Sequence, residues 1–359
     1  MAKHQSKLID IINDKCNTKD ILCHMVRAVK DIMTYEVKTL TLDDTIGTCL
    51  DIMTENKIRH IPVVDIVTEK DTKSHFVGIV SQRDVFRQIS PYLEKIGQAN
   101  SDINALQQLL VQIVTRKPKC ASPESPIQYA TTLMVENHVD SVPVLFENDL
   151  VGIVTATDVL RLFVRLHAIG HLYEEKTKTE PRRRFVDLLA GNSDEAIWAL
   201  SSVLGTVKDI MTEEVVSLDE HDNLDKVMKL MQKGKFRHVP VVDRQKKLVG
   251  IISDRDVLRL LPYRKGQRKA KSEVFRADLF DVEPYEPVTH QQVYRIMNRD
   301  VIHVQPDCGF HEVVKMLHEK KISCVPVIDE NKNILGIATV TDVMRGLLAA
   351  YALFEKTSA

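Results

Sequence analysis

Apolar and polar positions along this 359-residue chain recur four times in the same order. Each copy has a glycine, two or three apolar residues, a hydroxyl side chain, two further residues and an aspartate, and another apolar pair follows. The four copies run from Gly78 to Asp84, Gly152 to Asp158, Gly250 to Asp256 and Gly336 to Asp342. This pattern predicts a short buried strand that leads directly into a helix.

Two further landmarks precede each copy at constant spacing. An apolar residue followed by proline and valine begins at Ile61, Val142, Val239 and Val325, and an apolar pair begins at Ile32, Ile113, Ile210 and Ile296. Met33 and Pro62 are 29 positions apart, and the other three copies repeat this interval. Equal spacing between matching landmarks indicates an internal repeat, which decides the fold.

Within repeat one, the periodicity predicts the order strand, helix, strand, strand, helix. Val37, Leu40 and Leu42 mark an extended stretch, and Asp43 and Asp44 are expected to cap the helix that follows. The expected apolar face of this helix consists of Ile46, Cys49, Leu50 and Met53, and the expected strands are Ile61 to Ile66 and Phe76 to Val80.

One repeat is too small to bury both a sheet face and a helix face, so we expect repeats one and two, and repeats three and four, to pair. The length also favours about two domains. The predicted fold class is therefore α/β (α+β), with two pseudo-twofold modules. The predicted division is a helical lead-in at 1–28, repeats at 29–90, 111–166, 207–261 and 293–348, a connecting helix at 91–110, linkers at 167–206 and 262–292, and a tail at 349–359.

Composition narrows the function classes. The formal net charge of −1 and the 5% aromatic content disfavour a nucleic-acid partner, and the basic stretches Arg182–Arg184 and Arg264–Lys271 are expected to be solvated loops. The six cysteines form no CxxC pair, and no apolar run is long enough to cross a bilayer. His167 and His171 lack an evident third metal ligand, and no catalytic motif occurs. We expect a soluble, cytoplasmic, non-catalytic protein without a metal site.

The motifs DIMT at Asp31 and Asp209, RHIPVVD at Arg59 and RHVPVVD at Arg237, with the four glycine-to-aspartate runs, resemble the cystathionine beta-synthase (CBS) domain. The resemblance covers all four repeats and implies two Bateman modules in tandem. It also implies adenosine ligands in the clefts between paired repeats. The four-repeat layout is similar to that of the nucleotide-sensing gamma subunits of AMP-activated protein kinase.

The hydroxyl and the aspartate three residues apart have two compatible interpretations. They match a capping box, which needs no ligand. The resemblance implies that the aspartate binds a ribose diol and that the hydroxyl lies near ribose or phosphate, beside a helix N-terminus that suits an anion. Repeats one and three add arginines, whose planar fork matches phosphate, so we rank their sites first. A solvated surface or a strut between repeats remains the alternative for these arginines.

The resemblance also points to the place five residues before each proline, where Lys57, His138, Lys235 and Lys321 stand instead of arginine, so a preference for polyphosphates stays open. The predicted nucleotide-binding residues are Thr34, Val37, Lys57, Arg59, His60, Ile61, Pro62, Ser81, Arg83 and Asp84 in repeat one, and Thr212, Val215, Lys235, Arg237, His238, Val239, Pro240, Ser253, Arg255 and Asp256 in repeat three. A second tier consists of His138, Thr155, Asp158, Lys321, Thr339 and Asp342. For the apolar members, plain core packing is an equally good interpretation.

The sequence therefore predicts a regulatory sensor of AMP, ADP or ATP, with Mg²⁺ accompanying a polyphosphate and with an unidentified protein target. Ligand binding is expected to rearrange the modules. The alternatives are an assembly module whose clefts stay empty and a nucleic-acid-associated regulator. A homodimer is compatible with this reading, because the sequence leaves open whether the two modules form a disc within one chain or between chains.

Overall fold

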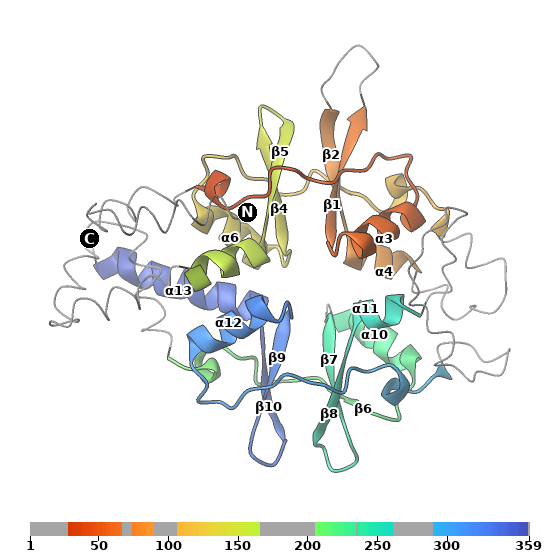
Figure 1. Ribbon diagram of the computed structural model, residues 1–359, viewed down its shortest axis with the longest axis vertical. Helices are drawn as coiled ribbons and strands as arrows, with labels where there is room; N and C mark the ends of the chain where they lie inside the picture. Colours follow the sequence, from red (N-terminus) through yellow and green to blue (C-terminus); the bar gives the residue numbers. More distant parts are fainter. Residues whose placement is uncertain are drawn as a thin grey trace, which may run out of the picture.

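The computed structural model describes residues 28–66, 74–89, 106–165, 205–234, 236–260 and 290–357. In this part of the chain the four repeats surround a common centre in a flattened disc, with repeats one and two in one half and repeats three and four in the other (Figure 1). Nearly all of the predicted lead-in helix, most of the connecting helix and almost all of both linkers lie outside the described residues.

Each repeat contains a helix, two antiparallel strands and a second helix, as the periodicity predicts. Repeat one has α3 (Ile46–Glu55), β1 (His60–Ile66), β2 (Ser74–Ser81) and α4 (Gln82–Ile89); repeat two has β3 (Thr115–Arg116), α6 (Ile127–Glu136), β4 (Ser141–Phe146), β5 (Asp149–Thr155) and helical residues 156–165. Repeat three has β6 (Leu218–Asp219), α10 (Leu224–Gly234), β7 (His238–Val242), β8 (Leu248–Ser253) and α11 (Asp254–Leu258); repeat four has α12 (Phe310–Glu319), β9 (Cys324–Ile328), β10 (Ile334–Thr339) and α13 (Val340–Thr357). A 3₁₀ turn stands at the start of each repeat, at η1 (Val29–Asp31), η3 (Leu110–Gln112), η4 (Val207–Asp209) and η7 (Val293–Arg295).

The predicted first strand of each repeat is a short parallel addition to the proline-containing strand. It is a single bridge from Leu40 to Val63 in repeat one and a two-residue strand, β6, in repeat three. None of the described helices is long and apolar enough to span a lipid bilayer.

Helix α3 begins after a different capping residue from the one predicted. The side chain of Thr45 accepts a hydrogen bond from the backbone N–H of Thr48 at 3.1 Å, which makes Thr45 the N-cap. Oδ2 of Asp44 instead accepts a hydrogen bond from the backbone N–H of Thr41 at 2.7 Å, which closes the turn before the helix. The prediction that Asp43 and Asp44 cap this helix is therefore wrong. Its apolar face is confirmed, because Ile46, Cys49, Leu50 and Met53 are all buried.

The two repeats of a module exchange their leading segments. Thr34, near the start of repeat one, makes two backbone hydrogen bonds with Ile153 of β5 in repeat two, at 2.9 and 3.0 Å. In the other direction β3 pairs with β2 at Gly78. A Cβ at Gly78 would collide with the backbone of Thr115, and one at Gly152 would collide with Met33. The motif glycine is thus required where the partner repeat's segment crosses the strand.

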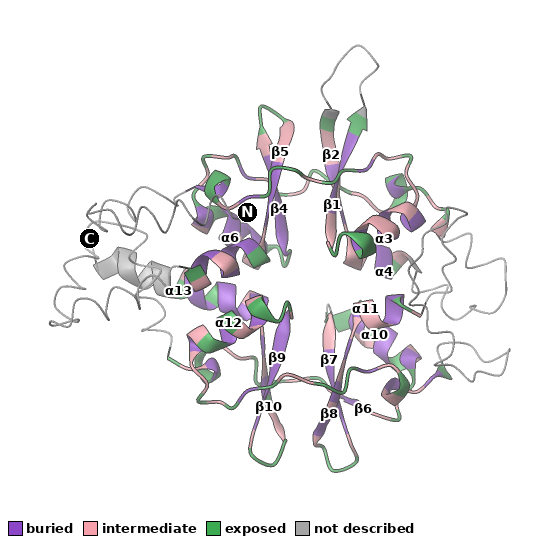
Figure 2. Ribbon diagram, viewed as in Figure 1, coloured by how far each residue is buried: buried purple, intermediate pink, exposed green. Residues whose placement is uncertain are grey.

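The two modules share two hydrophobic cores (Figure 2). One core combines repeats two and four, and α6 packs on α13; the other combines repeats one and three, and α4 packs on α11. Because both cores contain residues from both modules, the disc forms within one chain, which answers the question that the sequence left open.

Candidate functional site

The aspartate of each glycine-to-aspartate run closes the same turn. Its Oδ2 accepts hydrogen bonds from the backbone N–H and from the hydroxyl of the Ser or Thr three residues earlier. In the pair Ser81 and Asp84 these distances are 2.8 and 2.6 Å. The bond from the carboxylate to the capping residue's N–H, one half of the predicted capping box, is present in all four copies, and the second carboxylate oxygen distinguishes them.

That second oxygen, Oδ1, has the fewest hydrogen-bond or ion-pair partners in repeat one. In repeats two and four it is paired with an arginine, at 2.6 Å from Arg161 to Asp158 and at 2.9 Å from Arg345 to Asp342, and both carboxylates are buried. In repeat three Arg259 reaches Asp256 at 3.2 Å. Asp84 is half-buried, and within the described part of the chain no donor contacts its Oδ1. Asp84 and Asp256 are therefore more accessible to a ligand than their counterparts.

The predicted nucleotide-binding residues near the start of each odd-numbered repeat and at its proline divide into two groups. Thr34 and Thr212 are exposed, and Val37 and Val215 are half-buried, on the leading segments that cross to the other repeat. The first of these segments brings Thr34 beside Ile153 of β5, the strand of repeat two that leads to Asp158. The second group, Ile61, Pro62, Val239 and Pro240, is buried, and the core accounts for its side chains without a ligand.

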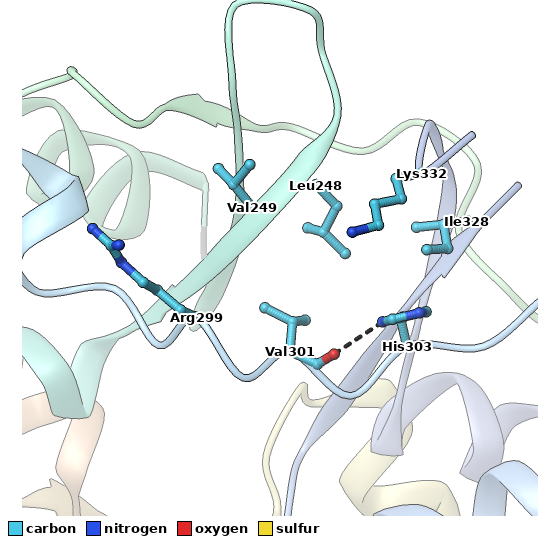
Figure 3. A pocket seen from close by; sticks show the side chains of 7 residues that line it. All are labelled: Leu248, Val249, Arg299, Val301, His303, Ile328 and Lys332. Atoms are coloured by element: carbon cyan, nitrogen blue, oxygen red, sulfur yellow. Dashed lines mark hydrogen bonds between the residues drawn. The ribbon is translucent and has the colours of Figure 1, made fainter. Parts of the chain in front are cut away.

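A hollow of about 290 Å³ lies between repeats three and four (Figure 3). It is lined by Leu248, Val249, Arg299, Val301, His303, Ile328 and Lys332. Val301 stands four positions after Met297, as Val37 stands four positions after Met33. The leading segment of repeat four therefore lines this hollow, whereas the predicted residues Thr34, Val37, Thr212 and Val215 are not among the residues that line it. Its volume is near the lower limit of ordinary small-molecule sites.

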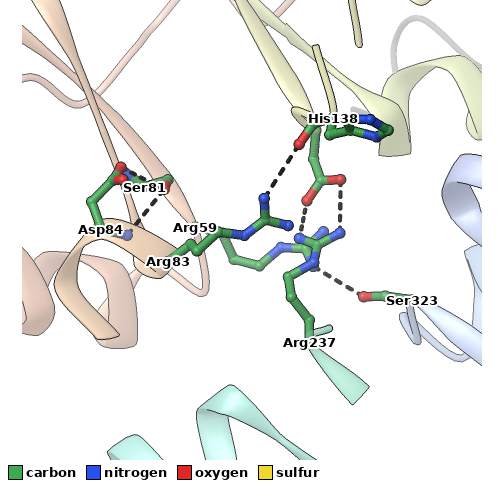
Figure 4. A network of polar contacts seen from close by, with 8 residues as sticks. Arg59, Ser81, Arg83, Asp84, His138, Arg237 and Ser323 are labelled. Atoms are coloured by element: carbon green, nitrogen blue, oxygen red, sulfur yellow. Dashed lines mark hydrogen bonds and ion pairs between the residues drawn. The ribbon is translucent and has the colours of Figure 1, made fainter. Parts of the chain in front are cut away.

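The centre of the disc is formed by four equivalent positions, each three residues before a repeat's proline. They are occupied by Arg59, Asp140, Arg237 and Ser323. Arg237 donates two hydrogen bonds to Asp140, one of them 2.8 Å long, and Arg59 donates one to the hydroxyl of Ser323 at 3.0 Å (Figure 4). Each arginine thus reaches an even-numbered repeat of the other module. Sequence reasoning found the two arginines but missed Asp140 and Ser323, although all four share one register.

Positive charge exceeds negative charge at this centre. Arg83 and Arg255 lie near Arg59 and Arg237, whereas the nearby carboxylates are Asp140 and Asp254. Burial, opposed by Asp140 and reinforced by Arg237, lowers the pKa of Arg59 to about 10. Such an under-neutralised guanidinium cluster favours an added anion.

The two carboxylates of the centre respond differently to burial. Burial would raise the pKa of Asp140, but Arg237 and then Arg59 hold this pKa well below its usual range, so Asp140 is ionised. Burial raises the pKa of Asp254, and the neighbouring arginines only partly oppose that rise. Sequence reasoning did not single out Asp254, which lies inside the Ser253-to-Asp256 run.

The histidines that precede the two odd-numbered prolines are neutral. Burial lowers the pKa of His60 and of His238 to about 3, and the adjacent arginines act in the same direction. Their imidazoles can therefore offer one donor and one acceptor but no charge near neutral pH. Both residues keep part of their surface accessible to solvent.

The residues five places before each proline have a structural role of their own. Lys57, His138 and Lys321 are exposed and have φ angles of 55°, 54° and 55°, at the point where a helix ends. The contact of His138 with the centre is made by its carbonyl oxygen, which accepts a bond from Arg83 at 3.4 Å. Lys235 lies outside the described residues, as do His167 and His171. Within the described ranges, no cluster of His, Cys, Asp or Glu could hold a metal ion.

Comparison with protein families supports the sequence resemblance. The CBS domain matches residues 29–91, 110–165, 207–263 and 293–349, which is more than half of the chain. The chain belongs to the CBS-domain family. Two relatives from Methanocaldococcus jannaschii match most of it: MJ1404 is 25% identical over 88% of this chain and 61% of its own length, and MJ1225 is 24% identical over 89% of this chain and 98% of its own length.

Two solved structures have a similar fold over most of this chain. The crystal structure of MJ1225, described as a proposed archaeal homologue of γ-AMPK, has a TM-score of 0.65 at 22% identity and covers 89% of this chain and 99% of that one. A conserved protein from Pyrococcus horikoshii has a TM-score of 0.51 at 22% identity, with coverage of 90% and 100%. At this identity the likeness establishes the fold.

Proposed function

We propose that this CBS-domain chain is a non-catalytic, cytoplasmic regulatory protein that binds AMP, ADP or ATP between its paired repeats, with the phosphates directed towards the centre of the disc. The observation that carries the proposal is the excess of guanidinium groups over carboxylates where the four repeats meet. Guanidinium groups match phosphate oxygens in shape as well as in charge. The likeness of the fold to MJ1225, itself compared with γ-AMPK, supports the same function.

Asp84 and Asp256 are the proposed ribose contacts. Each already has one oxygen fixed by a Ser hydroxyl and backbone N–H, so the carboxylate is pre-oriented. A nucleotide bound there touches two repeats of one module, and its phosphates approach arginines that reach the other module. The ligand would thus bias the arrangement of the modules, by no more than its preference for one arrangement over the other.

A thermal-shift panel tests the proposal. AMP, ADP and ATP, with and without Mg²⁺, are compared with S-adenosylmethionine and cyclic dinucleotides. A ligand at a hundred times its dissociation constant adds about 2.7 kcal/mol to the free energy of unfolding, which is easily detected. Asp84→Ala and Asp256→Ala should abolish the shift, whereas Asp65→Ala, at an exposed position of β1, should retain it. If no adenosine compound stabilises the protein, the proposal is wrong.

The structure also contains one feature that favours an assembly module with empty clefts. The four aspartate turns give Oδ2 of each aspartate its hydrogen-bond donors without any ligand, and Asp140 already neutralises Arg237. In that case the unliganded protein is fully stable, and Asp84→Ala leaves binding to a protein partner unchanged. Partner capture by the wild type and by Asp84→Ala therefore separates the two functions.

A further inference from the structure

The two central arginines occupy equivalent positions but meet different partners. Arg237 of repeat three donates both of its hydrogen bonds to the carboxylate of Asp140 in repeat two. Arg59 of repeat one meets the neutral hydroxyl of Ser323 in repeat four. Asp140 and Ser323 are themselves equivalent, so the pseudo-symmetry of the disc is broken by one charged group.

The carboxylate of Asp140 occupies the place that a phosphate would take on Arg237. A guanidinium binds a carboxylate and a phosphate with the same pair of parallel N–H donors. Asp140 is 7% exposed and its neighbours keep it ionised. A phosphate that approaches Arg237 must displace this carboxylate or lie close to its negative charge, and repulsion is strong where little water screens it. At Arg59 the hydrogen-bond partner is a neutral hydroxyl, and Asp140 acts on this guanidinium through its charge without a direct hydrogen bond.

We propose that Asp140 is the residue that sets the phosphate specificity of this disc, by competing with the phosphate groups of the ligand for Arg237. The inference rests on the proposed function. It implies that the centre accepts ligands with few phosphate groups, held by Arg59, and discriminates against longer phosphate chains that extend to Arg237. It also implies that a ligand which does reach Arg237 breaks the connection between repeats two and three.

The variants follow from the internal symmetry of the chain. Asp140→Asn removes the charge at nearly constant size, and Asp140→Ser reproduces the partner that Arg59 has. Ser323→Asp is the reciprocal change, which gives Arg59 a carboxylate. Glu147→Gln, at the exposed tip of the β4–β5 hairpin, is the matched control, since it removes one negative charge far from the centre.

Titration calorimetry at constant ionic strength then compares adenosine, AMP, ATP and inorganic triphosphate as probes. Asp140→Asn and Asp140→Ser should leave adenosine affinity unchanged and increase the affinity for ATP and triphosphate about tenfold or more, with a smaller gain for AMP. Ser323→Asp should weaken ATP and triphosphate binding by a similar factor. Glu147→Gln should behave as the wild type.

The outcomes separate this inference from the proposed function. If all probes bind but the Asp140 variants change none of them, or change adenosine as much as ATP, the inference is wrong and the proposed function stands. If adenosine compounds fail to bind, the proposed function is wrong, and the binding of inorganic triphosphate then tests the role of Asp140 alone. Tighter triphosphate binding to the Asp140 variants then upholds the inference, and equal or absent binding overturns it. Should one Asp140 variant or Ser323→Asp not fold, the remaining Asp140 variant suffices.

Discussion

The rings of Phe163 and Phe310 meet edge to face, with their centroids 5.6 Å apart and their planes at 89°. Phe163 belongs to the last helix of repeat two and Phe310 begins α12 of repeat four, and both are buried in the core that these repeats share. The contact therefore joins the two modules through apolar packing. An edge-to-face pair adds to the stabilisation that burial alone provides.

Phe310→Ala should lower the free energy of unfolding by about 3 to 5 kcal/mol, because it removes a fully buried ring from this shared core. Both modules should lose stability together in one cooperative transition, which urea denaturation followed by circular dichroism would measure. Phe146→Ala is the control, since that ring is 58% exposed, and its effect should be small. Two separate transitions, with only one displaced, would show that the modules fold independently.

The four motif glycines should differ in their tolerance of a methyl group. A Cβ at Gly78 would collide with the carbonyl of Thr115, a backbone atom, whereas one at Gly336 would first meet the flexible end of Met211. Gly78→Ala should thus cost about 1 to 3 kcal/mol, and Gly336→Ala should cost less. Equal losses, or a larger loss at Gly336, would contradict this account of the crossing segments. Chemical denaturation of the two variants in parallel provides the comparison.

The sequence predicted what depends on local pattern. The interval between Met33 and Pro62, which recurs in all four copies, identified the repeat, and the small size of one repeat then predicted that the repeats pair into modules. The hydrogen bonds of Ser81 with Asp84 could also be predicted from the sequence, since capping geometry spans only three residues. The N-cap of α3 could not be predicted, because Thr45 and Asp44 are both good capping residues and only the geometry of the turn determines which of them caps the helix.

The centre of the disc could not be predicted in the same way. Arg237 and Asp140 are 97 residues apart in the chain, and Arg59 and Ser323 are 264 residues apart. Such pairs arise from the docking of one module on the other, for which no local pattern codes. The repeated register before the proline would have suggested that the four positions are equivalent, but not that they converge.

Stability should fall in mild acid because of His60 and His238. Both pKa values are lowered to about 3, so the unfolded chain takes up protons below about pH 6.5 while the folded protein does not. Stability is therefore complete above about pH 6.5, and each histidine removes up to about 1.4 kcal/mol per pH unit below it. Urea denaturation at about pH 7.5 and about pH 5 should show this loss, and His238→Gln should halve it. If His238→Gln lost as much stability as the wild type on acidification, the acid sensitivity would come from other groups.

The bond between Arg237 and Asp140 should be far stronger than an exposed ion pair of similar length. Both side chains are at most 19% exposed, so water screens the pair weakly, whereas the pair of Lys229 with Asp225 on α10 is 2.6 Å long but largely exposed. A double-mutant cycle with Asp140→Asn and Arg237→Met should give a coupling energy of about 1 to 3 kcal/mol. The same cycle with Asp225→Asn and Lys229→Met should give less than about 0.5 kcal/mol.

The two ion pairs should also differ in how their coupling energies respond to added salt. Screening should reduce the coupling on α10 and leave the central coupling nearly unchanged, because the Debye length governs only charges in contact with solvent. Coupling energies from urea denaturation at low and high ionic strength measure both effects. If the central coupling were as small and as sensitive to salt as that on α10, Asp140 would hold Arg237 too weakly to compete with a phosphate.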